Sequence, residues 1–175
     1  MFWNEENYDV SKHPYMKWAY DNQKWEFVSD YARLDLVYSY GGIYFDTDCE
    51  LIRSPDILRK FSAFVGYEST QIIATGLGIG GIAGNEMIRL LLSEYDKVDV
   101  KQKDFDMTPC TLMATHCLKR QGLKCDNSFQ MLGKGELAVL PTEILCGIRL
   151  YTKAKQITDR TVSMHHWCGE WGAEQ

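Results

Sequence analysis

The feature that most constrains the fold is a predicted helix that ends at two glycines and leads directly into a short apolar strand. Residues 29–40 carry apolar side chains at helical intervals. Gly41 and Gly42 end the helix and permit a tight turn. The β-branched and aromatic residues 43–45 then predict a buried strand, which ends at Asp46. A helix followed at once by a strand is typical of an α/β domain.

The rest of the chain alternates between helical and strand patterns. Further helices are expected over 14–27, 85–95 and 108–122, strands over 62–67, 136–145 and 161–167, and a glycine-rich hairpin or loop over 74–84. This alternation predicts an α/β fold with a mixed, mostly parallel sheet flanked by helices. No repeat or linker divides the sequence, so one domain over residues 1–175 is expected. Ligands of such sheets bind at the carboxyl ends of strands, which is where Asp46 falls.

Charge and composition narrow the range of partners. The formal net charge is −5 and basic runs are scarce, which argues against a nucleic acid or an anionic membrane surface as the ligand. No segment approaches the roughly 18 apolar residues that span a bilayer, and the N-terminus does not resemble a signal peptide. The six cysteines form no CxxC pair, so free thiols are expected rather than a structural zinc site. These features predict a cytoplasmic protein.

Two carboxylates stand two residues apart where the predicted strand ends, in Asp46-Thr47-Asp48. Mn²⁺ and Mg²⁺ prefer oxygen ligands, and Mg²⁺ sites typically combine one or two carboxylates with substrate phosphates. The pattern therefore predicts a site at which a cation binds a diphosphate. The same spacing also occurs in ordinary solvated turns, so the interpretation depends on the surrounding residues.

The helix before the strand supports the prediction of a site. Ser29 and Asp30 suit its N-terminus, and the three-residue spacing places Asp30 and Arg33 on one helical face. Arg33 could bind a phosphate or orient a carboxylate. The alternative for Arg33 is a structural ion pair with Asp30 or Asp35.

The stretch SDYARLDLVYSYGGIYFDTD, residues 29–48, resembles the signature of glycosyltransferases with a DXD sugar-binding region. That group includes initiating mannosyltransferases and bacterial capsular-polysaccharide enzymes, and the similarity runs from about Trp3 to Trp171. The resemblance implies a GT-A fold, which is Rossmann-like, a UDP- or GDP-sugar donor, and Mn²⁺ or Mg²⁺. It also implies transfer with retention to a glycan or lipid-linked acceptor, in bacterial surface-polysaccharide synthesis. The expected location is the inner face of the membrane, with peripheral association.

The same resemblance implies roles for individual residues. Those implied in the reaction are Asp30, Arg33, Asp46 and Asp48. Those implied at the donor are Ser29, Asp30, Arg33, Tyr44, Asp46 and Trp171. The implied metal ligands are Asp46 and Asp48, joined by a histidine from the C-terminal segment.

A second cluster of candidate residues lies in MHHWCGEW, residues 164–171. His165 and His166 follow a predicted strand, and imidazole is a common ligand for cations of the Mn²⁺ class. Successive strand residues face opposite ways, so only one of the two is expected to reach the metal. In similar transferases this segment folds over the donor, which implies that Trp171 covers the leaving diphosphate. Glu170 stands where the family usually has serine, and it is expected either to bind the metal or to shift Trp171.

The resemblance starts at the second strand of the family's fold, so a fold without the usual N-terminal strand is expected. A shortened piece, a mis-assigned start and a naturally short protein would each explain this. One alternative function is a non-catalytic remnant that binds sugar nucleotides weakly or pairs with a complete transferase. Another is a phosphotransferase of the haloacid dehalogenase type, in which the first aspartate is the nucleophile. Glu50, where that class has threonine or valine, disfavours the phosphotransferase.

Overall fold

The computed structural model describes residues 3–4, 6–101 and 108–168 of the 175. Within these ranges, five strands form the main sheet in the order β1-β4-β3-β6-β5, and two more form a small sheet. The strands are β1 (Gly42–Tyr44), β3 (Ala63–Tyr67), β4 (Ile73–Gly81), β5 (Gln130–Leu132) and β6 (Leu137–Leu140) in the main sheet, and β2 (Cys49–Leu51) and β7 (Ser163–His165) in the small one. The helices are α1 (Pro14–Asp21), α2 (Trp25–Tyr40), α3 (Glu86–Leu92), α4 (Cys110–Arg120) and α5 (Thr142–Leu145), with 3₁₀ helices η1 (Pro55–Lys60), η2 (Tyr95–Lys97) and η3 (Gly133–Gly135).

The main sheet is mixed and flanked by helices, so the predicted α/β fold class is confirmed and is consistent with a GT-A-like fold. The prediction that the sheet is mostly parallel is wrong. Among the described strands, only β3 and β6 pair in parallel. Five residues join β3 to β4 and four join β5 to β6, whereas a parallel connection needs a crossover of a dozen or more. β1, β3 and β6 nevertheless run in the same direction, so their carboxyl ends share one edge of the sheet.

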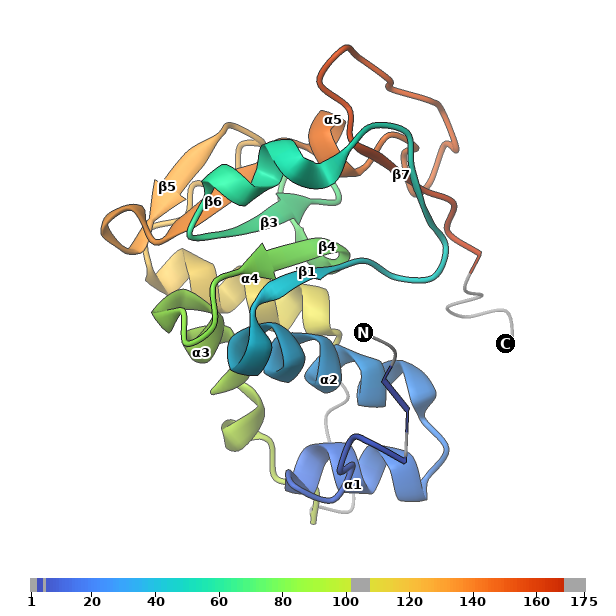
Figure 1. Cartoon of the computed structure of the whole chain (residues 1–175), viewed down its shortest axis with the longest axis vertical. Coiled ribbons are helices and arrows are strands. Elements are labelled where there is room, and N and C mark those ends of the chain that lie inside the picture. Colours follow the sequence, from blue (N-terminus) through green and yellow to red (C-terminus); the bar gives the residue numbers. More distant parts are fainter. Residues whose placement is uncertain (1–2, 5, 102–107, 169–175) are drawn as a thin grey trace.

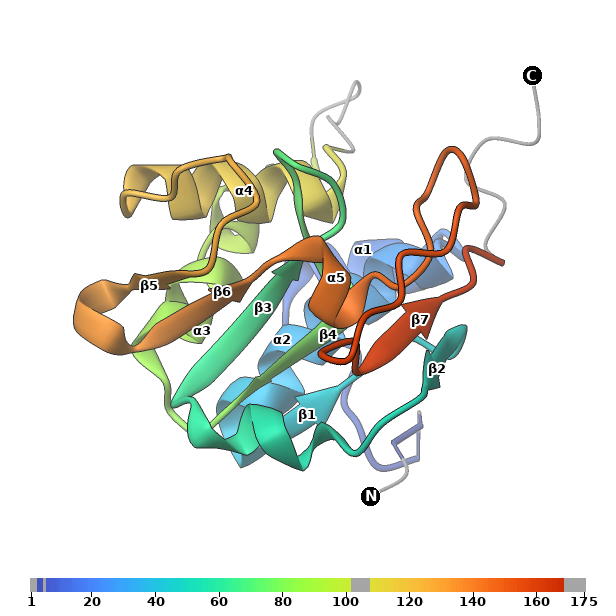
Figure 2. The ribbon, with the colours of Figure 1, turned by 90° about the horizontal axis from the view of Figure 1, so that it is seen from above.

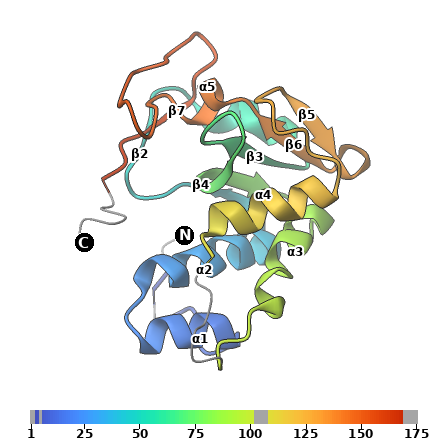
Figure 3. The same ribbon diagram turned by 180° about the vertical axis from the view of Figure 1, so that it is seen from behind.

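The hydrophobic core lies on both faces of the main sheet. Figure 1 and Figure 3 show α2, α3 and α4 on one face and α5 on the other. The alternation of side chains along β3 produces this arrangement. Val65 packs into the cluster on the helical side, and Phe64 packs into the opposite cluster with Leu58 of η1 and Leu145 of α5.

The helix boundaries before the site differ from the expected ones. The helix expected over 14–27 breaks before its end, because Gln23 has a positive φ of 57°. The next helix, α2, starts at Trp25. Ser29 and Asp30 therefore lie inside α2, although they were expected at its N-terminus. The apolar face of α2 begins one turn earlier, because Phe27 and Val28 already pack against the core.

Residues 74–84, expected as a hairpin or loop, are for most of their length a strand inside the sheet. This strand, β4, loses its register with β3 at residues 75–78, which bulge out of the ladder. Gly78 lies in the bulge with a φ of 147°, a conformation that favours glycine. The glycine pattern therefore marks a bulge within a strand.

Candidate functional site

The predicted site residues gather along the edge of the main sheet at which β1, β3 and β6 end. Asp46 follows β1 and Asp48 precedes β2, so both carboxylates stand in the turn between these strands. The backbone N–H of Cys49 donates to the carbonyl oxygen of Asp46 at 3.0 Å and closes the turn. β2 pairs with β7, and Figure 2 shows how this small sheet brings the C-terminal segment against the turn.

The Asp46 carboxylate is held on several sides. Tyr44 donates its hydroxyl hydrogen to Oδ1 at 2.9 Å, and Arg33 Nη2 lies 3.3 Å from the same oxygen. Oδ2 lies over Gly76, where a Cβ atom would be only 2.0 Å away. Burial alone would raise the pKa of Asp46, but the nearby His165 imidazole and the charge of Arg33 lower it below its usual value. The carboxylate is therefore ionised and fixed in orientation.

Arg33 is the buried cation of the site. Its Nη2 lies 2.8 Å from Asp30 Oδ1 and also contacts Asp46, and only 5% of Arg33 is exposed. Burial alone would lower the pKa of Arg33, but the two carboxylates raise it above its usual value, so the guanidinium stays charged. Asp35 instead accepts a hydrogen bond from the Tyr8 hydroxyl at 2.7 Å. Of the two structural partners considered for Arg33, the structure shows Asp30, and the pairing with Asp35 is wrong.

Asp30 lies away from the surface, and Ser29, beside it in α2, is half-buried. The Ser29 hydroxyl oxygen accepts a hydrogen bond from Arg33 Nη2 at 3.2 Å. Asp30 is 1% exposed, and its burial raises its pKa while the charge of Arg33 opposes that shift. In this structure Asp30 is out of reach of a ligand at the surface, so it contacts Arg33 where the resemblance implies a contact with the sugar.

The two histidines of the C-terminal segment point to different places. His165 Nε2 lies 3.1 Å from Asp48 Oδ1 and 3.9 Å from Asp46 Oδ2, and the residue is buried. His166 Nε2 lies 2.9 Å from Glu50 Oε2, and both of these side chains are exposed. The structure therefore brings His165 to the two carboxylates and leaves His166 outside the cluster.

Cys49 also belongs to this cluster, and it was not among the predicted site residues. One oxygen of Asp48, one ring nitrogen of His165 and Sγ of Cys49 all lie within 4.8 Å of one another. Burial, together with the charges of Asp46 and Asp48, raises the pKa of the Cys49 thiol to about 12. Only the pairing of β2 with β7 makes Cys49 and His165 neighbours, and no local pattern in the sequence signals that pairing.

The segment after β7 covers the outer side of the cluster. The rings of Trp167 and His165 have centroids 4.1 Å apart. The backbone N–H of Cys168 donates to Asp48 Oδ2 at 2.9 Å. Trp171, the predicted cover of the diphosphate, lies outside the described residues, and so does Glu170.

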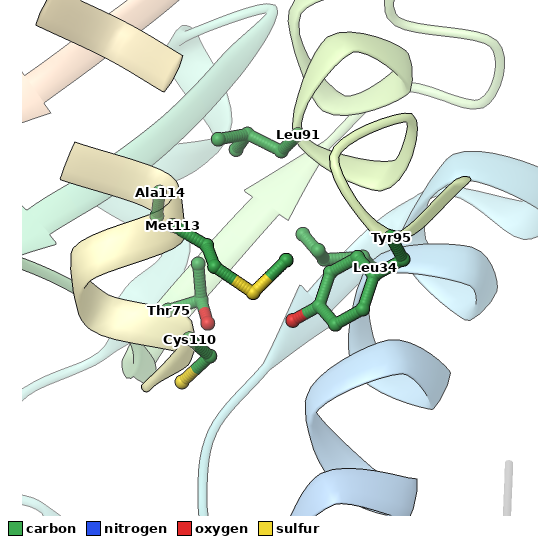
Figure 4. Close-up of a pocket in the computed structure, with 7 residues that line it drawn as sticks. All are labelled: Leu34, Thr75, Leu91, Tyr95, Cys110, Met113 and Ala114. Carbon is green, nitrogen blue, oxygen red and sulfur yellow. The ribbon is translucent and has the colours of Figure 1, made fainter. Parts of the chain in front are cut away.

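Two further features near the site were not predicted. Glu68 follows β3 at the same edge of the sheet, and burial raises its pKa to about 7, with the nearby His165 opposing the shift. A small cavity lies between α2, α3, α4 and β4, and Thr75, Tyr95 and Cys110 place polar atoms on its wall (Figure 4). Its volume of about 10 Å³ suits one water molecule, which is too small for a substrate.

Residues 1–65 match the family model of the glycosyltransferase sugar-binding region containing DXD motif. The match includes α2 and the turn with Asp46 and Asp48, and it ends before the segment with His165. No curated protein matches the chain, and no solved structure matches it. None of the described helices is both long and apolar enough to cross a bilayer. The family match supports a glycosyltransferase-type function, and a sugar-binding region implies a sugar donor.

Proposed function

We propose that this chain is a glycosyltransferase that binds a UDP- or GDP-sugar through Mn²⁺ or Mg²⁺ and transfers the sugar, with retention, to a glycan or lipid-linked acceptor. The observation that carries the proposal is the meeting of Asp46, Asp48 and His165 at the carboxyl edge of the sheet, beside the buried charge of Arg33. Bacterial surface-polysaccharide synthesis is the setting proposed with it. Peripheral association with the inner face of the membrane would bring a lipid-linked acceptor to this edge.

The charges of the site favour a divalent cation. Asp30, Asp46 and Asp48 contribute three carboxylates, and Arg33 is the guanidinium that lies among them. A diphosphate adds more negative charge, and a divalent cation placed between the two offsets the repulsion. Carboxylate oxygen and imidazole nitrogen are ligands that suit Mn²⁺, so the residues present fit such an ion. When bound, the ion supplies Lewis-acid stabilisation of the departing diphosphate.

The two aspartates of the turn have different surroundings and are proposed to have different roles. Asp48 and His165 are the proposed metal ligands, because Asp48 Oδ1 and His165 Nε2 lie 3.1 Å apart. Asp46 has one oxygen held by Tyr44 and Arg33. Its other oxygen is proposed to bind the metal or a hydroxyl group of the donor.

Asp30 and Ser29 are proposed as positioning residues. Both contact the guanidinium of Arg33 from within α2, on the side away from the turn. They fix Arg33 where it reaches Asp46, and the charge of Arg33 then lies where an anionic donor would bind.

Calorimetric titration with UDP and with GDP, each with and without Mn²⁺, tests the proposal. The wild-type protein should bind one of the two nucleotides only when Mn²⁺ is present. Asp48→Asn should weaken this Mn²⁺-dependent binding by at least about tenfold, because it removes a charged ligand from the site.

Glu50→Gln is the matched control for this titration. Glu50 lies two residues after Asp48, is exposed, and contacts His166. The Glu50→Gln variant should therefore bind nucleotide and Mn²⁺ as the wild type does. A folded wild-type protein that binds neither nucleotide with Mn²⁺ would overturn the proposal and leave the non-catalytic alternative. An aspartyl adduct with beryllium fluoride would instead indicate a phosphotransferase.

A further inference from the structure

The small β2–β7 sheet places a thiol beside the proposed metal ligands. Cys49 and His165 stand directly opposite each other in the antiparallel pairing, so their side chains leave the same face with β-carbons about 4.5–5.5 Å apart. Asp48 directs its carboxylate to the same place, 3.1 Å from His165 Nε2. We propose that Cys49 is a third protein ligand of the cation and that the site therefore prefers a thiophilic divalent cation, such as Zn²⁺ or Co²⁺, to Mg²⁺. This inference rests on the proposed function only in placing a cation at this turn.

The spacing of the three ligand atoms suits a small cation after a slight contraction. Three atoms that lie within 4.8 Å of one another can all lie within about 2.8 Å of a single ion, and Zn²⁺ bonds to these ligands are about 2.0–2.3 Å long. Sγ of Cys49 now lies 3.6 Å from the carbonyl oxygen of Gly76 and 3.8 Å from that of Leu77. Such thiol contacts are weak, so the sulfur can turn towards an ion at little cost.

The ligand set determines which cation is preferred. Thiolate and imidazole ligands favour Zn²⁺ and Co²⁺, whereas Mg²⁺ sites are built from oxygen ligands. Asp48, Cys49 and His165 would supply one oxygen, one sulfur and one nitrogen. Three protein ligands leave a fourth tetrahedral position open, as in catalytic zinc sites, and a diphosphate oxygen could take it.

Binding in this way releases one proton to solvent. The Cys49 thiol loses its proton as the metal–sulfur bond forms. His165 Nδ1 now accepts the backbone N–H of Trp167 at 3.2 Å, which places the ring proton on Nε2, beside Asp48. To offer Nε2 to the metal, the ring takes the tautomer with its proton on Nδ1 and gives up the hydrogen bond from Trp167.

Titration of the purified protein with Co²⁺, followed by absorption spectroscopy, tests the assignment without an activity assay. The wild type should show a sulfur-to-cobalt charge-transfer band in the near ultraviolet. Cys49→Ser should lose this band, whereas Cys168→Ser, which removes an exposed thiol of the neighbouring segment, should keep it. Cys49→Ser should also weaken Zn²⁺ binding by at least about tenfold and change Mn²⁺ binding by less than about threefold.

A wild-type protein that shows no charge-transfer band on titration with Co²⁺, or a band that persists in Cys49→Ser, would overturn the assignment. If Cys49→Ser does not fold, Cys49→Ala takes its place, and release of one proton per Co²⁺ by the wild type is a second readout. The two proposals fail separately. If the wild type shows the Co²⁺ charge-transfer band but binds no nucleotide, only the proposed function is overturned. If it binds nucleotide with Mn²⁺ but shows no such band, only the role of Cys49 as a metal ligand is overturned.

Discussion

At the scale of single residues, the site depends on one buried guanidinium that two carboxylates share. Arg33 lies 2.8 Å from Asp30, on its own helix, and 3.3 Å from Asp46, in the turn after β1. Because Arg33 and Asp30 are both almost fully buried, removing Arg33 leaves Asp30 as an uncompensated charge in the interior, whereas removing Asp30 leaves Arg33 with Asp46 as its remaining counter-charge. The ion pair therefore links the stability of α2 to the position of the Asp46 carboxylate.

Arg33→Met should lower the free energy of unfolding by about 3–5 kcal/mol, since it breaks a buried pair and leaves Asp30 without its counter-charge. The double variant Arg33→Met/Asp30→Leu should recover most of that loss, because apolar side chains replace both charges. Urea unfolding of the wild type and of both variants measures the difference. Equal stability of the single and double variants would show that Asp30 is not the charge that Arg33 compensates.

At the scale of secondary structure, the bulge in β4 makes room for these charges. The carbonyl oxygen of Gly76, within the bulge, accepts the backbone N–H of Asp46 at 3.0 Å. A Cβ atom at Gly76 would lie 2.0 Å from Asp46 Oδ2 and 2.8 Å from Arg33 Nη1. β-Bulges are over-represented next to active sites, and here the bulge lets a carboxylate and a guanidinium pack directly on the strand.

Gly76→Ala should displace the Asp46 carboxylate and weaken Mn²⁺-dependent nucleotide binding by at least about tenfold. Gly80→Ala is the matched control on the same strand, since its Cβ would meet the Phe64 ring at 2.4 Å, in the apolar core. The control should cost about 1–3 kcal/mol of stability and leave the affinity of the folded protein unchanged. Calorimetry and urea unfolding measure the two effects. Unchanged affinity in Gly76→Ala would show that the carboxylate accommodates the added methyl group.

The elements that the sequence predicts best are those set by local patterns. The helix before Gly41 and the short strand after it follow from side-chain periodicity and turn chemistry, and the structure contains both. The direction of neighbouring strands was predicted wrongly, because it depends on how few residues connect them. The glycine-rich residues 74–84 were predicted as a hairpin or loop, but most of them form the strand β4. Glycine suits a loop and a crowded bulge equally well, so its presence does not distinguish the two.

The candidate site divides in the same way. Asp46 and Asp48 are two residues apart in the sequence. Their position directly after a strand is a local prediction, and the structure matches it. The alternation of strand residues predicts that one histidine faces the turn, but only the register of β2 with β7 decides that it is His165. The same register places Cys49 in the cluster, so no local pattern could have signalled it.

At the scale of the whole molecule, the edge of the sheet that carries the site also carries a half-buried acid. Glu68 follows β3, and burial raises its pKa from 4.5 to about 7, with His165 opposing the shift. In the unfolded chain the same carboxyl ionises near its ordinary pKa of 4.5. Between those two values, the unfolded state has released a proton that the folded state still holds. The free energy of unfolding therefore falls as the pH rises from about 4.5 to about 7.

Glu68→Gln should remove this part of the pH dependence. A pKa difference of about 2.5 corresponds to about 3 kcal/mol, and partial exposure of the side chain reduces the expected effect to about 1–2 kcal/mol. From pH 5 to pH 8, the free energy of unfolding of the wild type should fall by about 1–2 kcal/mol more than that of Glu68→Gln, as measured by urea unfolding. Glu86→Gln, exposed on α3, should stay within about 0.5 kcal/mol of the wild type. If Glu68→Gln and the wild type show the same pH dependence, the folded protein ionises Glu68 at no cost in stability. This edge of the sheet would then hold the negative charge of Glu68 without a bound cation.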